Sequence, residues 1–306
     1  MKTVSSEYIN TKFNNKEDYR REDERLDGEI FRIADDIALR CKDKPIVLLS
    51  GPSGSGKTTT AHKISRYLDE KGHKTHVISL DNYFKTILPD GQDEVDFESP
   101  SRIDSKMLSE HIKKISECKE IELPMFDFLS KKSVSSGIKL KRKKGEVVLF
   151  EGIHALNPLL TKDIPQEAKF KIYASALTSI LLDDHNYIPT TDNRLLRRIV
   201  RDYKYRGYSA EETIRRWPSV RAGEEKWIFP FQEEADVMIN TALLFELAAL
   251  RSQALPLLEQ VPENVPEYSE AYRLRKFLHY LKPISTDGLP PTSLLREFLG
   301  GSTFKY

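Results

Sequence analysis

Eight residues near the start of the chain combine glycines, hydroxyl groups and a lysine in a spacing that binds phosphate. The stretch Gly51-Pro-Ser-Gly-Ser-Gly-Lys-Thr58 fits the pattern Gly-x-x-x-x-Gly-Lys-[Ser/Thr] at every fixed position. Glycines let the backbone wrap closely around phosphates, and the N-terminus of a following helix adds partial positive charge. Lys57 would neutralise the β- and γ-phosphates, and the Thr58 hydroxyl would bind Mg²⁺. The polyphosphate-binding residues predicted from this loop are Gly51, Ser53, Gly54, Ser55, Gly56, Lys57, Thr58 and Thr59.

Two acidic residues come directly after predicted strands. Asp81 follows an apolar run at 74–80, and Glu151 follows the run 146–150. Carboxyl ends of parallel strands meet at one edge of a sheet, so both acids should lie beside the phosphate loop. Asp81 is then placed to act as general base for a hydroxyl nucleophile, and Glu151 to organise the water molecules around Mg²⁺. The alternative for Asp81 is a helix N-cap or a plain loop residue.

One segment concentrates positive charge. Arg194, Arg197, Arg198 and Arg201 are spaced i, i+3, i+4 and i+7, so on a helix they share one stripe. Four cations on one stripe repel each other unless an anion meets them, and guanidinium groups bind phosphate oxygens two at a time. We therefore predict a phosphate-clamping lid; the alternatives are a solvated face and an RNA-binding stripe.

The elements that would position these residues alternate between strands and helices. Periodicity predicts helices at 57–71 and 104–117, and a polar hairpin between the second helix and the third strand. The expected fold class is therefore α/β, a P-loop NTPase fold with a mainly parallel five-stranded sheet, helices on both faces, a hairpin insert and a helical C-terminal extension. The five strands are predicted at 45–50, 74–80, 146–150, 170–174 and 235–240. The expected organisation is an N-terminal arm and helix at 1–40, a core at 41–241 with the hairpin at about 119–143 and the lid at about 191–230, and the extension at 242–306.

Composition excludes several classes of protein. Lys and Arg total 48 against 47 Asp and Glu, so no global charge drives binding to nucleic acid or membranes. Cys41 and Cys118 have neither metal-ligand spacing nor the number that a disulfide framework needs. No apolar run is long enough to cross a bilayer. We expect a cytoplasmic protein with small-molecule partners and no membrane or nucleic-acid partner; a homo-oligomer is compatible with the sequence.

Taken in order, the motifs resemble those of the uridine kinase and phosphoribulokinase family, and more specifically a bacterial branch of uridine kinase-like nucleoside kinases. The resemblance covers about 45–240, and it implies an enzyme that uses ATP and Mg²⁺ to phosphorylate the 5′-hydroxyl of a nucleoside. The motifs that carry it are Gly51–Thr58, Asp81-Asn-Tyr83, Phe97-Glu98-Ser-Pro100, Pro124-Met-Phe126-Asp127, Leu149-Phe-Glu151-Gly152 and Arg194–Arg201.

The resemblance also implies roles for single residues. Asp81 falls on the catalytic base of the family, and Glu151 on the acid near Mg²⁺. Lys57 and Arg197 are the further residues expected to act in catalysis, while Arg197, Arg198 and Arg201 would clamp the phosphates. The residues expected on the acceptor side are Tyr83 near the nucleoside, Glu98 on the ribose hydroxyls, Phe126 stacked on the base and Arg194 on the sugar.

Two departures from the family pattern leave the acceptor open. Ser130-Lys131-Lys132 stands where uridine–cytidine kinases carry a base-reading histidine, and Phe126 replaces their stacking tyrosine. Glu98 also replaces an aspartate. Uridine or cytidine is the first candidate, and a free or phosphorylated sugar that meets Lys131 is the alternative. A regulator that binds ATP but turns it over slowly, or an RNA-binding protein, is the alternative from another class.

Overall fold

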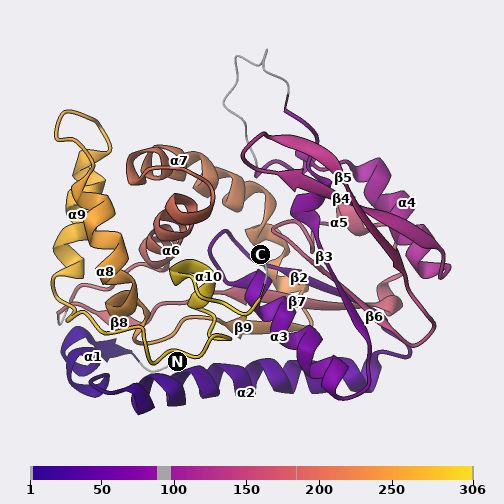
Figure 1. Cartoon of the computed structure of the whole chain (residues 1–306), viewed down its shortest axis with the longest axis horizontal. Coiled ribbons are helices and arrows are strands. Elements are labelled where there is room, and N and C mark those ends of the chain that lie inside the picture. Colours follow the sequence, from indigo (N-terminus) through magenta and orange to yellow (C-terminus); the bar gives the residue numbers. More distant parts are fainter. Residues whose placement is uncertain (1–2, 88–97, 184, 305–306) are drawn as a thin grey trace.

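A computed structural model describes residues 3–87, 98–183 and 185–304 (Figure 1). The predicted Phe97 motif residue lies outside these ranges. The strands are β1 (Val4–Ser5), β2 (Ile46–Ser50), β3 (Thr75–Ser79), β4 (Glu120–Asp127), β5 (Lys132–Lys141), β6 (Val147–Glu151), β7 (Lys169–Ser175), β8 (Ile180–Leu181) and β9 (Val237–Asn240). The α-helices are α1 (Ser6–Lys12), α2 (Lys16–Arg40), α3 (Lys57–Glu70), α4 (Ser105–Ser116), α5 (Pro158–Thr161), α6 (Thr190–Tyr205), α7 (Ala210–Trp227), α8 (Glu246–Glu259), α9 (Tyr268–Leu278) and α10 (Arg296–Leu299).

A five-stranded parallel sheet organises the molecule, in the order β3-β6-β2-β7-β9. β2 lies at its centre, with Leu49 paired to Glu151 of β6 and to Ile172 of β7. The sheet and its strand bounds confirm the predicted fold class. Because all five strands run the same way, the residues that follow β2, β3 and β6 meet at one edge.

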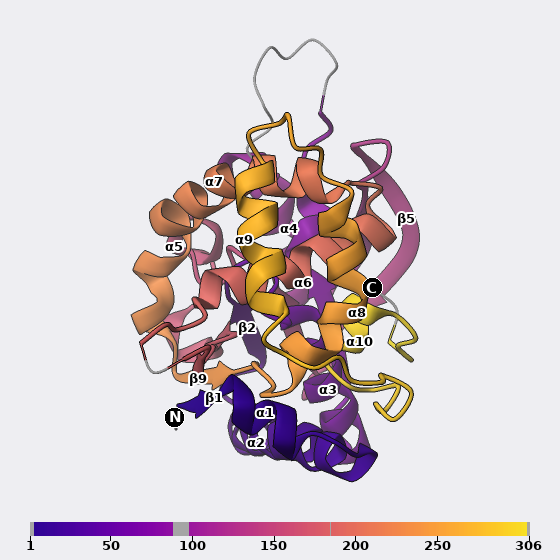
Figure 2. The same cartoon turned by 90° about the vertical axis from the view of Figure 1, so that its left-hand side faces the viewer.

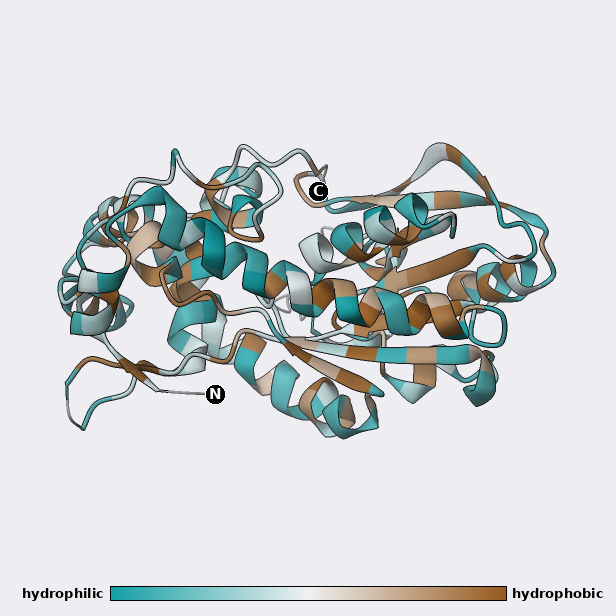
Figure 3. Cartoon of the chain, turned by 90° about the horizontal axis from the view of Figure 1, so that it is seen from below, coloured by the Kyte–Doolittle hydropathy of each residue, from teal (hydrophilic) through white to brown (hydrophobic). Residues whose placement is uncertain are grey.

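Both faces of the sheet are covered, which explains why its strands read as continuous apolar runs. On β2, Val47 and Leu49 belong to the cluster beneath α2, α3 and the C-terminal helices, while Ile46 and Leu48 belong to the cluster beneath α4 and the hairpin. Figure 3 shows the strands mostly in the hydrophobic colour, whereas the helices at the surface carry alternating hydrophobic and hydrophilic bands.

The N-terminal region is a long helix packed on the core. Asn15 caps α2 by accepting hydrogen bonds from the backbone N–H groups of Glu17 and Asp18. The helix then runs without interruption along α3, as Figures 1 and 2 show. Its Leu26 and Ile30 are fully buried, and α2 spans most of the segment predicted as an N-terminal arm and helix at 1–40.

The hairpin and the C-terminal extension flank the core. β4 and β5 pair antiparallel and are longer than the short strands predicted from the sequence. After β9, the chain continues into α8, α9 and α10, and α10 contacts α6 near the centre of the molecule (Figure 2). Within the described part of the chain, no helix combines the length and the apolar character that crossing a bilayer requires.

Candidate active site

The phosphate loop joins β2 to α3 and has the backbone shape that its glycines allow. Gly54 and Gly56 have φ of +74° and +76°, in the left-handed region that other residues rarely adopt. At Gly51 a Cβ atom would lie 2.0 Å from the carbonyl oxygen of Ala174 on β7, so only glycine fits there. The predicted strand, loop and helix are therefore all present.

A pocket opens over this loop, and Lys57 forms part of its base. Ser53, Gly54, Gly56, Lys57 and Thr58 line it, whereas Gly51 and Ser55 lie behind it and shape the loop. The Lys57 ammonium donates a hydrogen bond to the carbonyl oxygen of Pro52 at 3.1 Å. Burial lowers the pKa of Lys57, and the nearby carboxylates of Glu151 and Asp81 oppose that shift. The Lys57 ammonium would gain from contact with a ligand phosphate.

Asp81 and Glu151 both reach this pocket, as the strand ends predicted. Asp81 lies on the 3₁₀ turn η1 (Leu80–Tyr83) after β3, and Glu151 ends β6 with its side chain almost fully buried. Burial raises the pKa of Glu151 to about 7, and the charge of Asp81 adds to the shift. A cation between these carboxyl groups would relieve their mutual repulsion.

The arginine stripe forms on α6, and its last part reaches the pocket. Arg198 donates to Ser53 Oγ at 3.1 Å and lies 3.4 Å from Glu98. Arg201 donates two hydrogen bonds to Asp202, at 2.8 and 2.6 Å. Burial alone would raise the pKa of Asp202, but Arg201, Arg206 and Arg198 lower it to about 2. The carboxylate therefore stays ionised and holds the guanidinium groups at the pocket wall.

The other half of the stripe corrects the sequence prediction. Arg194 and Arg197 are fully buried and do not line the pocket. Arg194 forms a two-pronged ion pair with Glu224 of α7, and its Nη1 donates to the carbonyl oxygen of Ser53 at 3.0 Å. The anions that neutralise these guanidinium groups come from the protein itself. Both guanidinium groups support the back of the loop. Neither lies where the prediction placed it, which was on the sugar for Arg194 and on the phosphates for Arg197.

The helix of the expected lid packs into the core. Along α6 the buried side chains include Leu195, Leu196, Ile199 and Val200. α6 contacts α7, α8 and α10. Its apolar face is therefore buried against these helices.

Aromatic residues also differ from their predicted places. Phe126 is buried in an edge-to-face cluster, with ring centroids 5.5 Å from Phe84 and 5.1 Å from Phe128. Tyr83 is buried too, and its hydroxyl lies 3.0 Å from Nδ1 of His111. Neither lines the pocket, whereas Phe84 and Phe128 do. A stacked base would therefore meet Phe84 or Phe128 rather than Phe126.

Glu98 and Lys131 are the two remaining residues predicted on the acceptor side, and only Glu98 lines the pocket. Glu98 lines it and is held close to α7, since a Cβ atom on Gly223 would lie 2.4 Å from its Cβ. Lys131 sits in the turn between β4 and β5 with φ of +56° and does not line the pocket. An anionic group of the acceptor would need a different partner.

Several pocket residues escaped the sequence analysis. Arg206, with its guanidinium 4.2 Å from the Phe128 ring centroid, belongs to the basic segment but falls outside the i, i+3, i+4, i+7 stripe. Burial and the charge of Arg201 lower the pKa of Arg206 to about 10. Arg216 lies further along the chain on α7. Glu297 comes from the C-terminal extension. In the sequence, only the density of arginines after α6 could have pointed to Arg206 and Arg216.

The pocket fits a magnesium-bound nucleotide in its donor set. Thr58 and Glu151 offer oxygen atoms, the ligands that Mg²⁺ prefers. Within the described ranges, no cluster of three or more His, Cys, Asp or Glu side chains forms a metal cage. Mg²⁺ keeps several water molecules and phosphate oxygens in its coordination shell, so it needs few ligands from the protein.

Comparison with known proteins places the chain in a family. The model of the phosphoribulokinase / uridine kinase family matches residues 46–244, from β2 to just past β9. This chain belongs to that family. The match covers the sheet, the phosphate loop, Asp81, Glu151 and α6, and it ends before α8. The C-terminal extension that carries Glu297 lies beyond the match.

One curated relative agrees with this assignment, and two solved structures are similar over part of the chain. Uridine kinase of Staphylococcus aureus strain JH9 is 30% identical over 203 residues, covering 65% of this chain and 88% of the relative. A protein from Bacillus stearothermophilus described as a possible uridine kinase superposes with a TM-score of 0.42 and 18% identity over 65% of this chain and 89% of its own. D-glycerate 3-kinase from Cryptococcus neoformans superposes with a TM-score of 0.42 and 14% sequence identity. The superposition covers 62% of this chain and 80% of that protein.

Proposed function

We propose that this kinase-family protein transfers the γ-phosphate of ATP to a hydroxyl group of a nucleoside, with uridine or cytidine as first candidates. One arrangement carries the proposal: Lys57 at the start of α3, Asp81 on η1 after β3 and Arg201 on α6 line the same pocket. Together they offer charge for the phosphates and a carboxylate for the acceptor. Phosphoryl transfer needs little else from a protein than positioning and charge neutralisation.

Each residue then has one task. The loop amides and Lys57 hold the phosphates, with Arg198 and Arg201 facing them from α6. Asp81 accepts the proton of the acceptor hydroxyl as that oxygen attacks the γ-phosphorus. Mg²⁺, when bound near Thr58 and Glu151, would neutralise charge that develops on the phosphate oxygens. Buried in this pocket, these charges act with little screening by water.

The acceptor side supports a nucleoside through two features. Glu98 offers a carboxylate for sugar hydroxyl groups, and the rings of Phe84 and Phe128 give an apolar wall for a base. A relative from Staphylococcus aureus that is named uridine kinase matches this chain over 203 residues.

A specific observation favours a second candidate, a sugar phosphate. Arg206 and Arg216 both line the pocket, and Arg206 covers one face of the Phe128 ring. An arginine that occupies a ring face competes with a stacked base, and a phosphate on the acceptor would pair with it. A stacked base would therefore require Arg206 to leave the Phe128 ring, whereas a sugar phosphate would bind to Arg206 directly.

A substrate panel monitored by ADP release tests the proposal. Uridine, cytidine, the purine nucleosides, free pentoses and ribulose 5-phosphate are compared, with Lys57→Ala as the background control. We expect a nucleoside to give the highest kcat/KM. A sugar phosphate in first place, with its KM raised in Arg206→Ala and Arg216→Ala, establishes the second candidate. ATP binding without turnover of any acceptor would instead support a regulator. Salt-sensitive RNA binding that Arg201→Ala weakens would support an RNA-binding protein.

A further inference from the structure

The C-terminal extension places a carboxylate on the phosphate loop. Glu297 lies on α10, is 7% exposed and lines the same pocket as Lys57 and Thr58. Its Oε2 accepts a hydrogen bond from the Thr59 hydroxyl at 2.7 Å and one from the Thr59 backbone N–H at 3.3 Å. An acidic side chain from the far end of the chain thus occupies the start of α3.

The donor that Glu297 engages is one that an anionic ligand needs. The backbone N–H of Thr60 bonds to the carbonyl oxygen of Gly56, which is the first hydrogen bond inside α3. The amides before it, including that of Thr59, precede this first helical hydrogen bond and form the anion site of the helix N-terminus. A carboxylate oxygen and a phosphate oxygen cannot share this N–H group, because two anionic oxygens at hydrogen-bonding distance from one proton repel each other.

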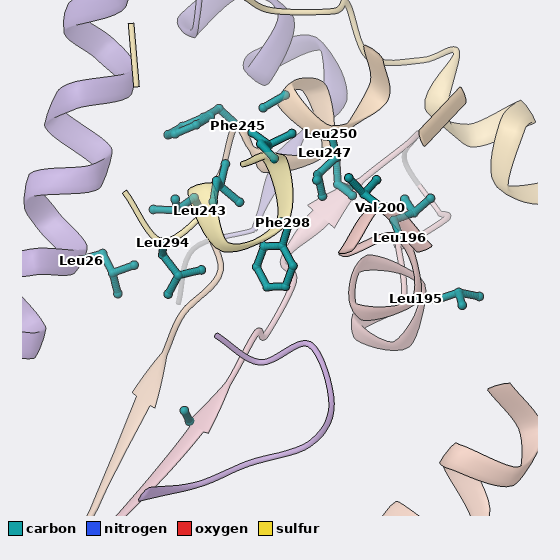
Figure 4. Packing of buried hydrophobic residues seen from close by; sticks show 14 of the residues in the cluster. Leu26, Leu195, Leu196, Val200, Leu243, Phe245, Leu247, Leu250, Leu294 and Phe298 are labelled. Atoms are coloured by element: carbon teal, nitrogen blue, oxygen red, sulfur yellow. The ribbon is translucent and has the colours of Figure 1, made fainter. Parts of the chain in front are cut away.

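Glu297 cannot leave the pocket by a simple movement of the backbone. Leu294, Leu295 and Phe298 on either side of it are fully buried, and Figure 4 shows Leu294 and Phe298 among the core side chains. A Cβ atom on Gly56 would lie 2.8 Å from Leu294, so this leucine sits directly on the loop. The carboxylate can move away only by rotation of its own side chain.

The local charge makes this position costly for a polyphosphate. Asp81 and Glu151 already line the pocket, and Glu297 adds a third carboxylate near Lys57. A negative charge held within a few ångströms of a ligand phosphate in a buried site, where water screens little, weakens binding.

We propose that Glu297 is an affinity-determining residue of the donor site, a built-in carboxylate that competes with ligand phosphate for Thr59. The inference rests on the proposed binding of ATP. The C-terminal extension, which lies beyond the family match, would then act at the phosphate loop. It would lower the affinity of the pocket for the donor ATP and for the product ADP.

Glu297→Gln tests the inference, because the amide keeps an oxygen that can accept from Thr59 but carries no charge. We expect the Kd values for ATP and for ADP, measured by calorimetry, to fall about tenfold. The Kd for adenosine, which carries no phosphate, should stay unchanged. Asp287→Asn is the matched control, since this acid lies in the same terminal segment and bonds to Ser285. It should leave all three affinities unchanged. Glu297→Ala serves as the second variant should the amide distort the loop, and thermal unfolding without ligand reports on folding.

Two results separate the failure of this inference from that of the proposed function. Unchanged or weaker ATP and ADP binding in folded Glu297→Gln and Glu297→Ala, with normal binding by the unmodified protein, overturns the competition. If the unmodified protein binds no ATP, the proposed function fails, and tripolyphosphate then decides the inference alone. Tighter tripolyphosphate binding by Glu297→Gln supports it, and equal or weaker binding overturns it.

Discussion

The Arg197 guanidinium on α6 and the Glu246 carboxylate on α8 form a two-pronged ion pair at the centre of the molecule. Nε bonds to Oε1 at 3.1 Å and Nη2 to Oε2 at 2.5 Å, and both side chains are fully buried. The remaining Nη1 donates to the carbonyl oxygen of Gly54 at 3.1 Å. The pair therefore joins the C-terminal extension to the phosphate loop.

Breaking this pair should destabilise the protein strongly. Arg197→Ala leaves the Glu246 charge buried without its cation, so we expect a loss of about 3–5 kcal/mol in the free energy of unfolding, measured by urea denaturation. Arg221→Ala is the control, because it removes an arginine from a surface pair with Glu225 on α7. Its expected cost is below about 1 kcal/mol. Similar costs for the two variants would contradict the structural role given to Arg197.

The opposite pattern is expected for Arg201, which lines the pocket. Arg201→Ala should lower kcat/KM for ATP by about 10²-fold or more, because it removes a charge-assisted contact with the phosphates. The free energy of unfolding should change less than in Arg197→Ala, since Asp202 keeps Arg198 and Arg206 as partners. Steady-state kinetics and urea denaturation on the same samples check this. Normal kinetics would place the phosphate clamp elsewhere.

The general base is tested by Asp81→Asn. The asparagine keeps the size of the side chain but cannot take the proton of the acceptor, so kcat should fall by about 10²–10⁴ while ATP affinity changes little. Single-turnover kinetics and nucleotide titration separate the two quantities. A loss below about tenfold would assign the base to another residue.

Asp23 on α2 predicts a pH dependence of stability. Its carboxylate accepts a hydrogen bond from Ser293 Oγ at 2.9 Å, and burial raises its pKa from 3.8 to about 6 although Lys63 opposes the shift. The folded state then holds a proton that the unfolded state loses, so this carboxyl group makes the free energy of unfolding fall as pH rises from about 4 to about 6.

The corresponding variant is Asp23→Asn, which keeps an acceptor for Ser293 and has no proton to lose. It should be more stable than the unmodified protein by about 2 kcal/mol at pH 8 and show little difference at pH 4. Urea denaturation at both values measures this. A stability difference that does not depend on pH would refute the shift.

The local sequence determined the sheet, the loop and the place of its acids. Largely apolar runs of five to seven residues predicted five parallel strands, and on β2 both faces are indeed buried. The glycine spacing at 51–58 predicted the phosphate loop, since its backbone angles depend on residue type. Asp81 reached the pocket because strand direction alone decides which edge a strand end occupies.

Tertiary structure decided which predicted side chains face the ligand. Helical spacing placed four arginines on one stripe, but it carried no information about Glu224 and Glu246, which come from α7 and α8 and hold Arg194 and Arg197 in the core. Glu297 reaches Thr59 across 238 positions of sequence. Pairings between distant elements depend on how the whole chain packs, and neither residue type nor local periodicity records them.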